Sequence, residues 1–121
     1  MNFLIKLLIS TLAVIITAKL LPGITIQNDS IIIALVVAAV LAFLNSILKP
    51  ILIFLTIPIT FFTLGFFLLV INAFIIMLTD KLVDGFSVDT FWHALFFSIV
   101  LSIVNSILSG LGRASDQQGR N

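Results

Sequence analysis

Residues 33–48 read IALVVAAVLAFLNSIL, and residues 93–108 read HALFFSIVLSIVNSIL. The two segments align without a gap and agree at eight of sixteen positions, ending in the same run, Asn-Ser-Ile-Leu. The similarity continues towards the N-terminus after a two-residue shift, where Thr17, Lys19, Leu20 and Gly23 match Thr79, Lys81, Leu82 and Gly85. The chain is therefore interpreted as an internal duplication of one helical hairpin, with repeats at about 7–48 and 69–108.

The composition indicates a membrane protein. Hydrophobic residues make up 61% of the chain, and only six basic and five acidic residues interrupt them. Long uncharged runs cover residues 7–18, 30–48, 50–79 and 90–112. Because about 20 apolar residues cross a bilayer as a helix, these runs predict an all-α membrane protein. A soluble domain of this size could not bury so much apolar surface.

Four transmembrane helices are predicted within a single membrane domain, residues 1–112. The expected spans are at about 3–21, 31–48, 65–80 and 91–110. Lys6 and Lys19 lie near the ends of the first span, where their side chains can reach the headgroups. This first segment is expected to be a retained helix, because no clear cleavage site of a signal peptide precedes Pro22.

The uncharged run at 50–79 is too long for one ordinary span and too short for two. Pro50 and Pro58 are expected to break the helix, and Gly65 offers a flexible joint. Thr56, Thr60 and Thr63 fall on one helical face. We therefore predict a linker helix at about 51–63 that either lies in the interface or re-enters the membrane, without deciding between these and a full crossing.

The placement of basic residues favours four spans with both termini in the cytoplasm. In that arrangement, four basic residues share one side of the membrane: Lys6, Lys49, Arg113 and Arg120. Lys19 and Lys81 lie on the other side. Two hairpins of the same orientation form a parallel repeat, whose twofold axis follows the membrane normal. Residues 113–121 are expected to be a polar, disordered cytoplasmic tail.

Small residues recur every four positions along the second and fourth spans. The two stripes occupy equivalent places in the repeats: Ala34, Ala38, Ala42 and Ser46, then Ala94, Ser98, Ser102 and Ser106. In lipid, helices associate through close approach of small side chains and through hydrogen bonds. These two spans are therefore expected to form a central pair, with self-association through the same stripes as the alternative.

Three asparagines accompany the stripes. Asn45 and Asn105 lie near the cytoplasmic ends of the second and fourth spans, and Asn72 lies in the middle of the third. An unpaired amide in hydrocarbon costs several kcal/mol, so each needs a partner. The asparagines either hold helices together by hydrogen bonds or line a polar path or headgroup site.

Catalytic chemistry is not expected. The chain has no cysteine and a single histidine, His93, at the end of a span beside Trp92. Asp80 and Asp84 have no further ligand nearby to complete a metal site. No phosphate-binding loop and no basic patch for nucleic acid is present. We expect no enzyme activity and no cofactor or metal, and no small-molecule substrate can be identified; the expected partners are the lipid bilayer and further copies of the chain.

Several ordered motifs resemble a known family. They run from Asn45-Ser-Ile-Leu-Lys49-Pro50 through Leu55-Thr56-Ile-Pro58 and Thr63-Leu-Gly65 to Asn72. This pattern resembles the phage holin family of small bacterial membrane proteins, the mycobacterial four-span holins of superfamily IV. Its signature positions in this chain are Asn45, Lys49, Pro50, Thr56, Pro58, Gly65 and Asn72.

The resemblance implies a four-span protein of the bacterial cytoplasmic membrane. A holin oligomerises in that membrane and opens lesions at a set time, so the first functional hypothesis is a holin-like protein that permeabilises it. The alternative is a non-lytic housekeeping protein of the envelope, which would act as a structural or partner-binding component or as a small conduit for lipid or solute.

Overall fold

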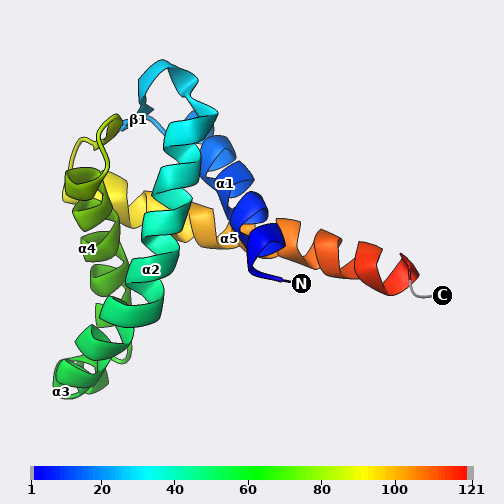
Figure 1. The fold of residues 1–121 in the computed structure, drawn as a ribbon. Coiled ribbons are helices and arrows are strands. Elements are labelled where there is room, and N and C mark those ends of the chain that lie inside the picture. The colour runs from blue at the N-terminus through cyan, green and yellow to red at the C-terminus, as the bar shows by residue number, and fades with distance from the viewer. Residues whose placement is uncertain (1, 120–121) are drawn as a thin grey trace.

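The computed structural model describes residues 2–119, and the side-chain surroundings of residues 2–112. The described chain consists of long helices with one short two-stranded ribbon (Figure 1). The elements follow in the order α1 (Phe3–Leu20), β1 (Ile24–Ile26), a 3-10 turn (Gln27–Asp29), α2 (Ile31–Leu55), α3 (Ile57–Phe62), α4 (Phe67–Leu82), β2 (Phe86–Val88) and α5 (Phe91–Gly119).

Three helices in the described chain are long and apolar enough to cross a membrane. These are α1, α2 and the segment Phe91–Gly112 of α5. Polar side chains cap the N-termini of α1 and α2. The Asn2 carboxamide accepts a hydrogen bond from the Ile5 N–H at 2.9 Å, and Ser30 Oγ accepts one from the Ile33 N–H at 3.3 Å. Such caps satisfy backbone donors that the first helical turn leaves free. The prediction of a helical membrane protein is confirmed.

The structure differs from the predicted linker at both prolines. Pro50 does not end a helix, because α2 continues through it to Leu55. Proline removes one backbone hydrogen bond, but membrane helices tolerate this loss. α2 ends at Leu55, and Thr56 is its C-cap. Pro58 lies in the first turn of α3, where a backbone N–H has no partner within the helix and its absence costs nothing. The linker helix is therefore only Ile57–Phe62, shorter than the predicted 51–63.

The end of the chain also differs from the prediction. The structure continues α5 to Gly119, so residues 113–119 are helical where the sequence predicts a disordered tail. The side-chain surroundings of these residues, and all of residues 120–121, lie outside the described part.

The predicted helical fold is confirmed, but the prediction did not include a short strand pair in the loops between the helices of each hairpin. β1 and β2 pair antiparallel, with Thr25 opposite Ser87 at the centre. Reciprocal hydrogen bonds extend the pairing, since the Gln27 N–H donates to the Gly85 carbonyl at 2.7 Å and the Asp89 N–H donates to the Gly23 carbonyl at 2.9 Å. The ribbon therefore joins the two hairpins directly.

The contacts at the ribbon repeat at equivalent positions of the two hairpins. Gly23 and Gly85 both adopt a left-handed backbone, with φ of +83° and +92°. A Cβ at Gly23 would overlap the His93 imidazole, and a Cβ at Gly85 would lie 2.6 Å from Ile33 Cδ1. Because Ile33 and His93 are also equivalent in the repeats, each turn packs on the second long helix of the other hairpin.

The long helices form a ring in the order α1, α2, α4 and α5, so that each contacts one helix of its own hairpin and one of the other. α1 packs on α2 and α5, and α4 packs on the same two helices, while α2 and α5 make little direct contact. The prediction that the second and fourth spans form a central pair is therefore wrong. Each of these helices lies between α1 and α4, which hold them apart.

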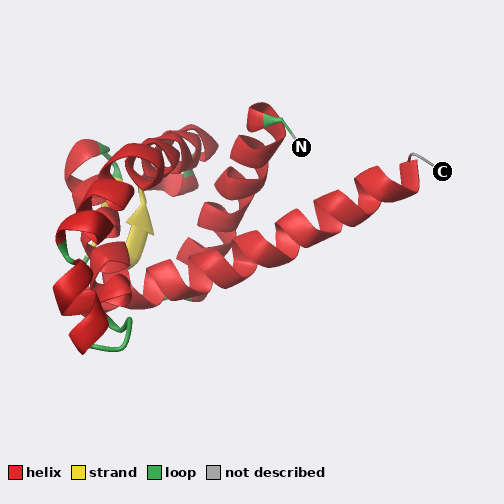
Figure 2. Cartoon of the chain, turned by 90° about the horizontal axis from the view of Figure 1, so that it is seen from below, coloured by secondary structure: helices red, strands yellow, loops and turns green. Residues whose placement is uncertain are grey.

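Most of the hydrophobic core lies in the half of the bundle next to the ribbon, and Leu44 and Ile71 extend it towards the other half. The largest side chains with almost no exposure include Phe97, Ile75, Val14 and Val37, and Phe86 of β2 packs on Phe97 with ring centroids 5.8 Å apart. Away from the ribbon the helices separate into two arms, α1 with α5 and α2 with α4 (Figure 1). Viewed from below, α5 runs as one long helix away from the rest of the bundle (Figure 2).

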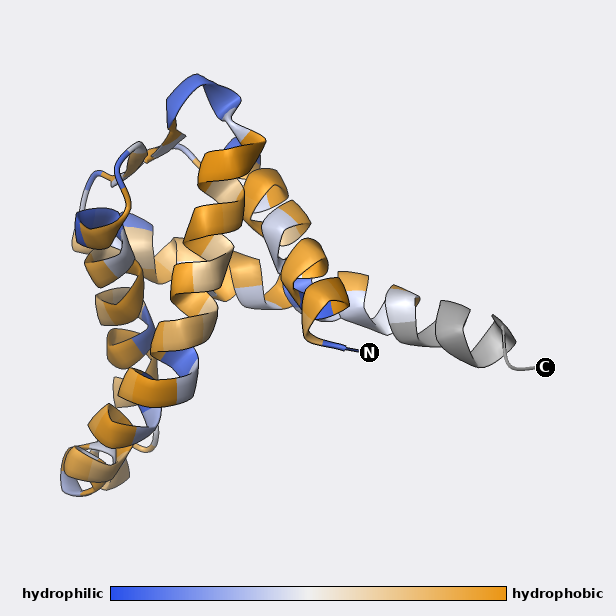
Figure 3. Cartoon of the chain, in the orientation of Figure 1, coloured by the Kyte–Doolittle hydropathy of each residue, from blue (hydrophilic) through white to orange (hydrophobic). Residues whose placement is uncertain are grey.

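Most helical residues in both arms are hydrophobic (Figure 3). Exposed large side chains continue from α1 to the tip around α3, where Phe61, Phe62 and Leu64 are 75%, 82% and 96% exposed. Such a surface requires a lipid environment. We call the half of the bundle opposite the ribbon the splayed end; it comprises residues 3–10, 42–72 and 101–112.

We expect Gly23→Ala to destabilise the protein more than Gly65→Ala. Both residues have a left-handed backbone, so alanine costs each about 1 kcal/mol in strain. A Cβ at Gly65 meets nothing within 4 Å, whereas one at Gly23 meets His93, which is held by a 2.8 Å contact between its Nδ1 and Thr90 Oγ1. Overpacking should add about 1–3 kcal/mol, measurable by unfolding in detergent micelles. Equal losses in the two variants would contradict the close packing at Gly23.

Candidate functional site

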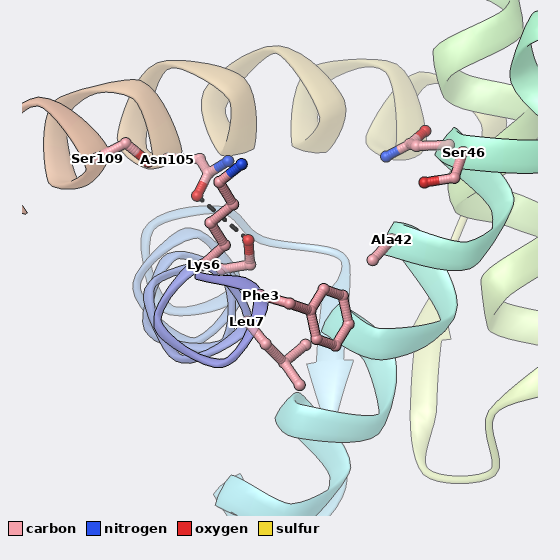
Figure 4. Close-up of a pocket in the computed structure, with 9 residues that line it drawn as sticks. Phe3, Lys6, Leu7, Ala42, Ser46, Asn105 and Ser109 are labelled. Carbon is pink, nitrogen blue, oxygen red and sulfur yellow. Dashed lines mark hydrogen bonds between the residues drawn. The ribbon is translucent and has the colours of Figure 1, made fainter. Parts of the chain in front are cut away.

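An open cavity of about 700 Å³ lies at the splayed end, between α1, α2 and α5 (Figure 4). Its polar lining consists of Lys6, Ser10, Asn45, Ser46, Asn105 and Ser109. In a chain that is otherwise so apolar, this concentration of polar side chains between helices makes the cavity the candidate functional site.

Two smaller cavities share Asn45 with the large one. A cavity of about 100 Å³ is also lined by Ser10, Ala38 and Asn105. A cavity of about 70 Å³ lies between Asn45, Lys49 and Asn72. The structure thus brings the three asparagines singled out from the sequence to one region, around Asn45.

The asparagines differ in their hydrogen bonding. Ser10 Oγ donates to Asn105 Oδ1 at 3.4 Å, which links α1 to α5 by a long and therefore weak bond (Figure 4). Within the described residues, neither the Asn45 nor the Asn72 side chain has a hydrogen-bond partner, and Asn45 is exposed. Asn45 therefore needs water, a ligand or another protein chain as its partner in a bilayer.

The small-residue stripes divide into two parts. Ala34, Ala38, Ala94 and Ser98 are buried in the core, where Ser98 Oγ donates to the Leu95 carbonyl at 2.8 Å. Towards the splayed end, Ala42 is half-buried, and three members are exposed: Ser46, Ser102 and Ser106. The buried part allows close packing of helices inside one chain, and the exposed part leaves hydroxyl groups free to meet other molecules.

Most of the remaining signature positions shape the backbone. Thr56 Oγ1 donates to the Leu52 carbonyl at 2.7 Å where α2 ends, and Gly65 adopts φ of +86° before α4 begins. Pro50 and Pro58 are exposed in α2 and α3. Lys49 lines the cavity of about 70 Å³. Of the signature, only Asn45, Lys49 and Asn72 therefore reach the cavities.

Three residues that line the cavity are not among the residues predicted from the sequence: Lys6, Ser10 and Ser109. The positions of Ser10 and Ser109 in the two repeats could have indicated them. Ser10 occupies the position in the first repeat that Asn72 occupies in the second, and Ser109 follows the second repeat where Lys49 follows the first. Comparing the polar residues of the two repeats position by position would have selected both.

Two titratable residues near the ribbon, Asp80 and His93, have structural partners. Asp80 Oδ2 accepts a hydrogen bond from the Val88 N–H of β2 at 2.9 Å. Thr90 Oγ1 accepts one from the His93 N–H at 3.3 Å and so begins α5. Among the described residues, no three histidine or carboxylate side chains gather as a metal ion would require. These groups stabilise the ribbon and the adjoining helix ends.

Comparison with known proteins identifies relatives over most of the chain. The model of the mycobacterial four-transmembrane-segment phage holins, superfamily IV, matches residues 1–107. The uncharacterised membrane protein YvlD of Bacillus subtilis is 39% identical over 85 residues, which cover 69% of this chain and 71% of that protein. An uncharacterised protein of Streptomyces coelicolor is 38% identical over 116 residues, which cover 89% of this chain and 93% of that protein. No solved structure matches the chain.

Replacing asparagine by leucine should distinguish an amide that has a hydrogen-bond partner in the chain, Asn105, from one that has none, Asn45. Asn105→Leu removes the bond from Ser10, so we expect a loss of about 0.5 kcal/mol in the free energy of unfolding. Asn45→Leu removes an exposed amide without a partner in the chain, and stability should stay equal or rise. Unfolding of the purified variants in detergent measures both. A clear loss in Asn45→Leu would instead identify Asn45 as a residue that holds helices together.

Proposed function

Since the chain belongs to the mycobacterial four-transmembrane-segment phage holin family, we propose that it is a holin-like protein whose copies assemble to permeabilise the bacterial cytoplasmic membrane. The observation that supports this function is the exposure of polar side chains at the splayed end, on helices that must lie in lipid. Asn45, Ser46, Ser102 and Ser106 all remain exposed in the single chain. Assembly would bring such groups from several copies around a shared aqueous space.

We propose that the chain crosses the membrane four times, with α4 as the third span. With 16 residues, α4 is about 24 Å long, somewhat less than the ~30 Å hydrocarbon layer. The turn before it can enter the hydrocarbon, because every backbone N–H from residue 63 to 69 has an acceptor. The membrane interior requires internal partners for backbone polar groups, and the donors of this turn have them.

The proposed orientation places the splayed end and both termini on the cytoplasmic side. Lys6 and Lys49 lie at the splayed end, and the last basic residues of the sequence, Arg113 and Arg120, come after the part of α5 that lines the cavity there. Lys19 and Lys81 lie at the ribbon end of α1 and α4. The larger basic group belongs on the cytoplasmic side. The equivalent contacts of Gly23 and Gly85 support two hairpins of the same orientation, as a parallel repeat has.

Permeabilisation requires more than one chain in this proposal. At the ribbon end, Phe86, Phe97 and Val37 are buried in a packed core, so the polar cavity opens only at the splayed end. Within residues 2–112 of a single chain, the buried core at the ribbon end interrupts any polar path across the membrane. An aqueous lesion would therefore form between chains, with the exposed parts of the α2 and α5 stripes facing it.

The closed ribbon end also supports the second candidate function, a non-lytic protein of the envelope. A bundle that two ribbon-linked hairpins hold together can be stable as a single chain. In that case the polar cavity would bind a partner or lipid without any lesion. The two candidates predict different membrane potentials on expression: a permeabilising protein depolarises the cell, and a non-lytic protein leaves the potential unchanged.

We expect a reporter fused after Asn121 to be active in the cytoplasm and a reporter inserted near Asp84 to be active outside it. Four spans with a parallel repeat require these opposite locations. Activity of enzymatic reporters in intact cells measures them. A C-terminal reporter on the outer side would contradict four spans, since an odd number of crossings would then be needed.

Controlled expression in a bacterial host should abruptly depolarise the membrane and end growth. The double variant Ser46→Leu, Ser106→Leu should abolish this effect, because it replaces exposed hydroxyls at equivalent positions of the two stripes. Membrane potential and viable counts are measured together, with insertion verified by membrane fractionation.

The control is Ile47→Leu with Ile107→Leu, at the neighbouring apolar positions, which are 51% and 59% exposed. This pair should depolarise cells as the wild type does. A steady potential with fully inserted wild-type protein would refute permeabilisation and favour the non-lytic envelope protein.

A further inference from the structure

We propose that the 700 Å³ cavity binds the phosphate-bearing headgroup of an anionic phospholipid. Lys6 supplies the positive charge, and no acidic residue is among the residues that line the cavity. Phosphate oxygens are strong hydrogen-bond acceptors and gain most from charged donors. The chemistry of the lining therefore favours an anion over a cation or a neutral solute.

The polar groups approach the cavity from two opposite walls. Lys6 on α1 extends towards α5, where it lies beside Asn105 in the close-up (Figure 4). On the facing wall, α2 contributes Asn45 and Ser46. The ammonium group, the amide NH2 groups and the hydroxyls can all donate. A headgroup placed between these walls would give the unpartnered Asn45 amide the acceptor that the chain itself does not provide.

Apolar side chains at the same cavity indicate a lipid as the source of the phosphate. Phe3 and Leu7 line it together with Ala42, and Phe3 points across the cavity towards α2 (Figure 4). Phe3 is 64% exposed at the end of a membrane helix. A free phosphate would gain nothing from these groups, whereas the acyl chains of a lipid would contact them.

The large cavity does not follow from the repeated fold alone. The cavity of about 70 Å³ between Asn45, Asn72 and Lys49 is lined mainly by residues equivalent to those of the cavity of about 100 Å³, and it is too small for a headgroup. At the position equivalent to Lys6, the second repeat has Leu68, which packs on the core. The first helix of the second hairpin therefore has no lysine at the position from which Lys6 lines the large cavity.

The assignment of this lipid to the inner leaflet rests on the proposed orientation, but headgroup binding does not depend on permeabilisation. Lys6 lies in the first turns of α1, at the membrane side where the proposed topology places the cytoplasm. The inner leaflet of a bacterial membrane contains anionic lipids, whose headgroups lie on the same side as Lys6 in this topology.

The test is native mass spectrometry of the purified full chain in detergent, titrated with phosphatidylglycerol or with phosphatidylcholine. We expect the wild type to retain phosphatidylglycerol preferentially, and Lys6→Gln to bind it about fivefold more weakly. Lys49→Gln removes the same charge at the same end of the bundle but outside the large cavity, and it should bind as the wild type does. Lys6→Arg should restore binding if the site needs a positive charge at this position.

Equal weakening by Lys6→Gln and Lys49→Gln would overturn the proposal, because general surface charge would then explain the binding. Displacement of the lipid by soluble glycerol phosphate at equal concentration would also overturn it and identify a free phosphate as the ligand. Circular dichroism of each variant checks that the fold is kept. Lipid binding without depolarisation of cells would refute only the permeabilising function, and depolarisation without Lys6-dependent binding would refute only the lipid site.

Discussion

The two hairpins are joined at one end by reciprocal backbone hydrogen bonds. The pairing of Thr25 with Ser87 and the bonds to the Gly23 and Gly85 carbonyls fix the hairpins relative to each other. Backbone bonds of this kind are needed because lipid provides little hydrophobic force between helices. The core forms where the ribbon holds the helices close, around Phe97, and the helices are free to diverge away from it. The position of the polar cavity follows from this one-sided attachment.

The divergence of the helices decides the surroundings of each polar side chain. Near the ribbon, hydroxyl groups are satisfied within their own helices: Thr17 Oγ1 donates to the Ala13 carbonyl at 2.7 Å, and Thr79 Oγ1 to the Ile75 carbonyl at 2.9 Å. At the splayed end, the distance between α1 and α2 leaves Asn45 without such a partner. Serines of one stripe therefore differ with position: Ser98 is buried and donates within its helix, whereas Ser102 and Ser106 are exposed.

Much of this arrangement could be predicted from the sequence, because apolar runs and their lengths determine membrane helices directly. The ribbon could not, since Ile24–Ile26 and Phe86–Val88 are too short to produce a strand pattern. Their alternating apolar and hydroxyl residues after equivalent glycines were the available signal. The effect of Pro50 was overestimated because its cost depends on surroundings that the sequence does not display. The absence of an α2–α5 pair depends on how the hairpins meet, which only the folded chain determines.

The predicted duplication would allow equivalent places in the two hairpins to diverge, which a dimer of identical hairpins could not do. Lys6 corresponds to Leu68, and Ser109 corresponds to Lys49, so the large cavity takes its lysine from a position that is apolar in the second hairpin. If a lipid headgroup and a second copy of the chain both use the exposed groups around Asn45, they compete for the same surface. A ligand that binds only the single chain opposes assembly by mass action. Bound anionic lipid would then hold the protein in its non-permeabilising form, and loss of that lipid would favour assembly.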